Sequence, residues 1–174
     1  MKNVTLLGID IAKEIFQLHG VEKSGKAVLK KKLRRAQLME YIVQLAPCTI
    51  VMEACGGSHY WAREFKKAGH QVKLISPQYV KPFVRGNKND RNDAEAIVEA
   101  ASRPRTRFVA INEESEQDVR SIHRVRSRLV GSRTAMVNEI RGLLYEYGVF
   151  QGKGITRIEN FLAEVNEDTN IKSS

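Results

Sequence analysis

Four acidic residues stand at positions from which their carboxylates can meet at one edge of a protein sheet. Asp10 ends the apolar run "VTLLGID", and Glu53 closes a second apolar run, "TIVMEA". Asp90 and Asp93 stand three apart at the start of "KNDRNDAEAIVEA". Residues three apart on a helix share one face, so the last two side chains can point the same way.

Carboxylates gathered in this way repel one another strongly unless a cation neutralises them. Oxygen ligands without His or Cys select Mg²⁺ or Mn²⁺ over zinc, and two such ions can promote displacement at a phosphodiester. Taken singly, each acid also has a structural interpretation. Asp90 can cap a helix and Asp93 can favour its positive end, whereas an unpaired Glu53 closing an apolar strand would be costly.

The elements that must position these acids follow from the hydrophobic pattern, which alternates with period two in strands and recurs every three or four residues in helices. An apolar strand, a strand in which Ile15, Gln17 and His19 alternate with apolar neighbours, and a strand with a charged edge form a meander. Alternating helices and strands follow, giving the order β-β-β-α-β-α-β-α. The predicted strands are 4–10, 14–22, 27–33, 49–54 and 71–76, and the predicted helices are 36–45, 59–69 and one from about 88 to before Pro104.

This order is that of an α/β protein with a ribonuclease H-like mixed five-stranded sheet and flanking helices. In that fold the first and fourth strands are adjacent and parallel. Asp10 and Glu53 would then emerge at the same end of the sheet, within reach of one ion.

A long helix is predicted over residues 113–148, ending at Gly148. Apolar residues recur along it at three- and four-residue steps, and Arg126 and Arg133 fall on the same seam, as in a coiled coil with two polar positions. The predicted organisation is a catalytic domain over 1–110, the long helix over 111–150 and a linker over 151–174. The apolar seam residues are Val119, Ile122, Leu129, Met136, Ile140, Leu143 and Tyr147.

The net charge of +9 and the pI near 9.7 favour a polyanionic partner, nucleic acid before membrane. Apolar runs are too short to span a bilayer, and two cysteines give no disulfide framework, so we expect a cytoplasmic protein. Candidate contacts to backbone phosphates are Lys13, Arg85, Lys88 and Arg91 near the acids, and Arg124, Arg126 and Arg128 on the long helix.

Three stretches in this order resemble the DEDD transposases of bacterial insertion sequences, a family that includes the Piv pilin-gene invertase and the bridge-RNA-guided recombinases. They are "GIDIAK" at 8–13, "MEACGGSHYWAREF" at 52–65 and "NKNDRNDAEAI" at 87–97. The resemblance covers residues 1 to about 150. It implies a RuvC-like domain whose acidic tetrad matches Asp10, Glu53, Asp90 and Asp93, binds Mg²⁺ and supports cleavage and strand exchange.

The resemblance also implies a coiled coil after that domain and assembly into dimers or tetramers on DNA, with a guide RNA from the element as a further partner. Family members continue into a second domain with a serine nucleophile, which this chain does not reach. We therefore expect an N-terminal portion that keeps the metal site but does not complete recombination.

Other functions fit parts of the pattern. A stand-alone Holliday-junction resolvase or ribonuclease H-like nuclease would use the same acids, although the arginine-rich helix favours something larger. A non-catalytic module binding RNA or DNA would need only the basic surface. Sugar-kinase or actin-like ATPases also begin with a "GID" strand, but Lys13 and Glu14 stand where those proteins place a small or hydroxyl-bearing phosphate turn.

Overall fold

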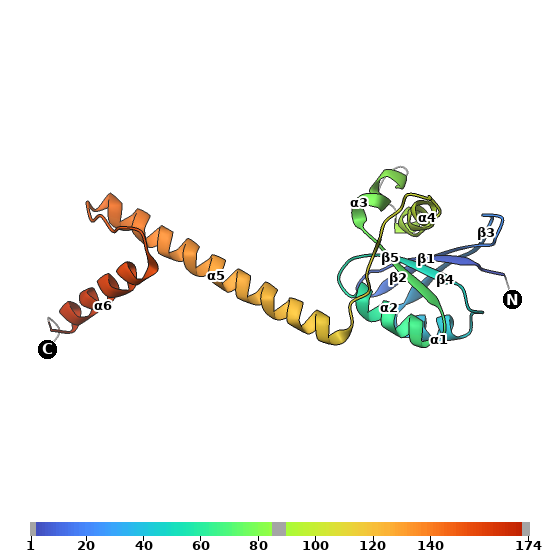
Figure 1. The fold of residues 1–174 in the computed structure, drawn as a ribbon, viewed down its shortest axis with the longest axis horizontal. Helices are drawn as coiled ribbons and strands as arrows, with labels where there is room; N and C mark the ends of the chain where they lie inside the picture. The colour runs from blue at the N-terminus through green and yellow to red at the C-terminus, as the bar shows by residue number, and fades with distance from the viewer. Residues whose placement is uncertain (1–2, 85–89, 172–174) are drawn as a thin grey trace. The chain divides into compact units, whose positions relative to one another are not determined.

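The computed structural model describes residues 3–84 and 90–171, with the backbone alone for 90–92 and 167–171. The chain divides into two compact units, Met1–Glu113 and Glu114–Ser174. In the first unit, a mixed sheet carries helices on both faces (Figure 1). None of the described helices combines the length and the apolar composition needed to cross a lipid bilayer.

The sheet has the order β3-β2-β1-β4-β5-β6. β1 is antiparallel to β2 and parallel to β4, and β4 is parallel to β5, which is the predicted ribonuclease H-like arrangement. The strands are β1 Leu6–Asp10, β2 Ile15–Val21, β3 Ala27–Arg34, β4 Thr49–Glu53, β5 Gln71–Ile75 and β6 Phe108–Val109.

The sixth strand corrects the predicted count of five. β6 contains two residues and pairs antiparallel with the end of β5, through Leu74 with Val109 and Ile75 with Phe108. Both of its residues are exposed. A segment this short has no alternating pattern, so its pairing depends on β5 already being in place.

Helices cover the two faces of the sheet differently. α1 (Arg35–Val43) and α2 (Ser58–Lys67) pack on one face, and α4 (Asp90–Ala101) covers β1, β2 and β4 on the other face, beside the short α3 (Pro77–Val80) and η1 (Lys81–Phe83). The larger core lies under α1 and α2, and contains among others Leu7, Ile9, Phe16, Ile50, Met52, Trp61 and Phe65. The smaller core lies under α4 and contains Val51, Ile75, Val80, Ala96, Ile97 and Ala100.

The second unit is a helical hairpin of α5 (Glu114–Glu146) and α6 (Ile155–Ile171). The predicted long helix is confirmed, and its C-terminus turns at Gly148, whose φ is 74°. The Val149 amide donates to the Leu144 carbonyl at 2.9 Å, a bond that closes a helix end around a left-handed glycine.

α6 was not expected, because residues 151–174 were predicted to be a linker. Ile158 on α6 and Val137 on α5 are both buried, and the Arg141 guanidinium donates to the Gly154 carbonyl. This local packing explains how a largely polar segment forms a helix.

Candidate metal centre

Asp10 and Glu53 end neighbouring parallel strands, as the sequence predicted. Ile9 is paired with Met52 in the ladder between β1 and β4, so Asp10 and Glu53 occupy the next positions on the two strands. Ile9 and Met52 are fully buried in the larger core. Side chains alternate between the faces of a strand, so Asp10 and Glu53 lie on the opposite face, which α4 covers.

α4 approaches that face most closely at Gly8. A Cβ built on Gly8 would lie 2.5 Å from the Ala94 carbonyl oxygen and 2.6 Å from Val98 Cγ2. Real Cβ atoms are not found so close to a backbone oxygen, so only glycine permits this separation. The contact brings the first turns of α4, including Asp93, to the ends of β1 and β4.

The charges of these side chains affect one another. Burial raises the pKa of Glu53, the negative charge of Asp93 raises it further, and the Lys81 ammonium opposes both effects. Burial also raises the pKa of the Cys55 thiol, with further contributions from Glu53 and Asp10. Asp10, Glu53 and Asp93 therefore belong to one acidic neighbourhood, in which like charges disfavour ionisation.

The fourth predicted acid and several predicted phosphate contacts cannot be placed. The Asp90 and Arg91 side chains lie outside the described residues, although their backbone is part of α4, and Arg85 and Lys88 lie outside them entirely. Among the side chains that are described, no three of the types His, Cys, Asp and Glu form a ready-made metal site. The donors that do gather are carboxylate oxygens, which fit Mg²⁺ or Mn²⁺.

The structure describes four of the predicted basic contacts and one basic residue that was not predicted. Lys13 is exposed in the connection between β1 and β2, where the sequence placed it beside Asp10. Lys81, at the start of η1, was missed as a site residue; its signal in the sequence was its place in a basic and aromatic loop between two prolines. Arg124, Arg126 and Arg128 are exposed on α5, in the second unit.

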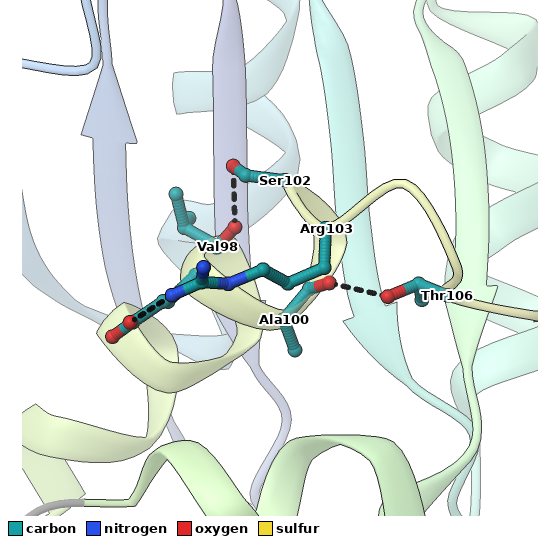
Figure 2. A network of polar contacts seen from close by, with 6 residues as sticks. Val98, Ala100, Ser102, Arg103 and Thr106 are labelled. Atoms are coloured by element: carbon teal, nitrogen blue, oxygen red, sulfur yellow. Dashed lines mark hydrogen bonds and ion pairs between the residues drawn. The ribbon is translucent and has the colours of Figure 1, made fainter.

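Hydrogen bonds fix the C-terminal end of α4, as Figure 2 shows. The Ser102 hydroxyl donates to the Val98 carbonyl at 2.8 Å, and the Thr106 hydroxyl donates to the Ala100 carbonyl at 2.6 Å. The Arg103 guanidinium forms an ion pair with Glu99 at 2.9 Å. The last carbonyls of a helix lack partners within it, so these bonds hold the helix end as the chain turns towards β6.

Glu53 leads into α2 through a glycine turn. Gly57, at φ 85°, precedes α2, and the Ser58 hydroxyl donates to the Cys55 carbonyl at 2.8 Å. Buried Ser58 thus fixes the chain immediately after the acid. This turn lies within the second of the three recognised motifs.

A sheet of this order, with acids at the ends of β1 and β4 beneath a covering helix, defines a ribonuclease H-like domain with an acidic centre. Residues 7–149 match the family model of the IS110-type DEDD transposases, described as "Transposase", and the chain belongs to that family.

Two relatives illustrate the similarity. A "Probable family 20 transposase" of Pseudomonas aeruginosa is 54% identical over 147 residues, covering 84% of this chain and 44% of the relative. The "Transposase for insertion sequence element IS1111A" of Coxiella burnetii is 50% identical over 157 residues, covering 90% of this chain and 43% of the relative. The chain therefore spans less than half the length of these two curated relatives.

Among solved structures, Thermus thermophilus RuvC in complex with a Holliday junction substrate matches with a TM-score of 0.45 and 14% identity. That match covers 62% of this chain and all of the RuvC chain.

Proposed function

We propose that this chain supplies the metal-binding, DNA-cleaving centre of an insertion-sequence transposase, with Asp10, Glu53, Asp90 and Asp93 as ligands of Mg²⁺ or Mn²⁺. The observation that carries the proposal is the register of β1 and β4, which puts Asp10 beside Glu53, together with the effect of the Asp93 charge on Glu53. Membership of the transposase family supports it.

Divalent metal bound at this centre would supply the positive charge that stabilises a phosphodiester during displacement. The protein's part is to hold the ligands in position. The central strands fix Asp10 and Glu53, while α4 brings Asp93 to them. Lys81 adds a positive charge near Glu53, which favours the approach of a phosphate.

We propose nucleic-acid and protein partners on the same basis. The basic charge and the family favour DNA, with a guide RNA from the element, in the bacterial cytoplasm at the nucleoid. On α5 the seam residues Val119, Ile122, Leu129, Met136 and Leu143 are all more than half exposed. Burial of that seam favours a homodimer or tetramer through a coiled coil, flanked by the arginines at 124, 126 and 128.

A second candidate is a catalytically incomplete module that binds nucleic acid. The specific observation in its favour is the net charge of +9, which favours a polyanionic partner whether or not the chain cleaves it. A stand-alone nuclease for Holliday junctions is the remaining alternative. Incubation of the chain with branched and linear DNA in Mg²⁺ separates these two alternatives: a resolvase cuts the junction unaided, whereas a binding module retains DNA without cutting it.

Removal of two predicted ligands tests the metal centre. We expect Asp10→Ala together with Asp93→Ala to abolish Mg²⁺ or Mn²⁺ binding in a calorimetric titration while the circular dichroism spectrum stays native. The reason is that two remaining carboxylates cannot replace the lost coordination.

The matched control removes two exposed carboxylates elsewhere, by Glu40→Ala on α1 and Asp118→Ala on α5. This variant has the same net charge as the test variant and should bind metal like the parent chain. Unchanged metal affinity in the Asp10/Asp93 variant would overturn the assignment of these ligands.

A further inference from the structure

One edge of the sheet carries a run of positive charge that the metal centre does not use. Between residues 23 and 35 the sequence has seven basic residues and no acidic residue. β3, at the outer end of the strand order, contains four of them. The basic residues are Lys23, Lys26, Lys30, Lys31, Lys32, Arg34 and Arg35.

Strand register divides the three consecutive lysines between the two faces of the sheet. Lys32 is paired with Gln17 and Lys30 with His19 across β2 and β3. Gln17 is in turn paired with Asp10 across β1 and β2. Paired residues point to the same face, so Asp10, Gln17 and Lys32 form one row on the face that α4 covers.

Lys31 lies on the other face. Its ammonium stands 4.0 Å from the centre of the Tyr41 ring, on α1. Lys31 and Lys32 are therefore adjacent, equally charged and both exposed, but they point to opposite sides of the sheet. With neighbouring strands about 4.8 Å apart, Lys32 stands two strands, or roughly 10 Å, from the Asp10 backbone.

A cavity of about 360 Å³ lies along this row, between β2, β3 and α4. It is lined by Gln17, Leu18, His19, Lys30, Lys31, Lys32, Ala94 and Glu95. Although Lys31 is part of this lining, its ammonium lies over the Tyr41 ring on the other face of the sheet. Gln17 and His19 are only 8% and 5% exposed, although strand positions facing a helix are normally apolar. Burial lowers the pKa of His19, so at neutral pH its ring offers hydrogen bonds rather than charge.

Glu95 partly neutralises this groove. Its carboxylate lies 3.1 Å from the Lys30 ammonium and 3.9 Å from His19 Nδ1. Lys32 has no ion-pair partner among the side chains that the structure describes. An anion entering the groove would therefore meet Lys32 directly and would compete with Glu95 for Lys30.

We propose that this groove, defined by Gln17, His19, Lys30 and Lys32, binds the phosphodiester backbone of the DNA strand that passes the carboxylates. This proposal rests on the proposed function, because it assumes that the scissile bond lies at Asp10 and Glu53. The row places charged and buried polar side chains at increasing distances from the acids. An extended nucleic-acid backbone could contact several of these side chains at once, whereas a single small anion could contact only one or two.

The test measures the binding of a fluorescein-labelled single strand of DNA of about 16 nucleotides by anisotropy, in EDTA. We expect Lys32→Ala to weaken binding about tenfold and to lower the slope of log affinity against log salt by about one, as loss of one phosphate contact predicts. Lys31→Ala, with the same charge change on the opposite face, should bind like the parent chain, and Lys32→Arg should restore affinity.

Glu95→Gln should have the opposite effect on DNA affinity. It releases Lys30 and removes a negative charge from the groove, so DNA binding should become several-fold tighter and more dependent on salt. Equal losses of DNA affinity for Lys31→Ala and Lys32→Ala would overturn the assignment of DNA binding to the groove, because the loss of one positive charge anywhere on the sheet edge would then explain both.

The same measurement with an RNA oligonucleotide of the same sequence distinguishes binding of a DNA backbone from binding of an RNA backbone. Weaker RNA binding with unchanged DNA binding in Lys32→Ala would overturn the assignment to DNA. Because EDTA removes divalent metal, the DNA-binding measurement does not depend on the metal centre. The groove proposal can therefore be refuted while the Asp10/Asp93 titration supports the metal centre, and the metal centre can be refuted while the groove is supported.

Discussion

Glu53 has opposite effects on folding and on the proposed metal binding. Burial and the negative charge of Asp93 raise its pKa in the folded chain. Between the ordinary glutamate pKa and this raised value, the folded state holds more protons than the unfolded state. The free energy of unfolding therefore falls as pH rises through that window and stays lower above it.

We predict that Glu53→Gln stabilises the metal-free chain at pH 7 by about 0.5 kcal/mol, a modest gain because solvent screens a partly exposed group. The gain should disappear below the ordinary pKa of glutamate, where the native side chain is protonated in both states. Urea denaturation in EDTA at several pH values measures it, and Glu40→Gln on the exposed side of α1 is the control.

In millimolar Mg²⁺ the parent chain should become more stable than Glu53→Gln, the reverse of their order in EDTA. Metal that binds only the folded state raises its stability, so the parent chain should gain and Glu53→Gln should not. A variant that gains as much from Mg²⁺ as the parent would show that Glu53 is not a ligand.

The sequence predicted the positions of acids that end strands, but it did not predict which strand residues a helix distant in the sequence would bury. Asp10 and Glu53 each close an apolar run, and the order of elements makes those runs neighbours. The alternation of Gln17 and His19 with apolar residues predicted a strand, but it did not predict that both polar side chains are buried beneath α4. That burial depends on a helix far along the chain, which no local pattern contains.

Among the elements, the packing of α4 on β1 depends on one missing side chain. Gly8 lets the Ala94 carbonyl approach to a separation at which a methyl group would clash. The neighbouring Asp93 is carried by the same turn of helix. The distance between strand and helix therefore sets where the proposed ligand lies.

We predict that Gly8→Ala lowers stability by about 1–3 kcal/mol, the usual cost of overpacking a close contact, and weakens Mg²⁺ binding because α4 must shift. Thermal unfolding and calorimetric titration measure the two effects. Gly131→Ala on α5, where a Cβ meets open space, is the control and should raise helix stability without changing metal affinity. Native metal affinity in a folded Gly8→Ala variant would contradict this role of the contact.

Elements with their own periodicity were predictable, whereas those that depend on a neighbour were not. The strands and α5 have clear apolar spacing, and α5 turns at the glycine that a left-handed end requires. β6 has only two residues. On α6, which contacts α5, Ile158 is buried while most of the described residues are exposed. Their formation is a consequence of packing on β5 and α5.

For the molecule as a whole, the exposed seam of α5 decides the expected assembly. The seam residues, counting the arginines at 126 and 133 among them, are separated by alternating steps of three and four. Polar seam residues reduce stability but restrict the register and number of helices. The coiled coil remains a prediction, for which the 59% exposure of Leu129 is the main support.

We predict that Leu129→Glu raises the dissociation constant of the oligomer at least about tenfold, because a charge replaces an apolar contact in the seam. Sedimentation equilibrium measures the constant. Ser127→Glu adds the same charge at an exposed position outside the seam and should leave assembly unchanged. Equal effects of both variants would indicate electrostatic repulsion rather than a seam.

The position of β1 between β2 and β4 also has a consequence for synthesis on the ribosome. The first strand to emerge lacks a parallel neighbour until Thr49–Glu53 follows, and its other face lacks a cover until α4 emerges. The 40 residues from Glu53 to Asp93 take about 2–8 seconds to translate at 5–20 residues per second. A nascent chain therefore acquires the proposed ligands in the order Asp10, Glu53, Asp90 and Asp93, and the proposed centre stays incomplete during those seconds.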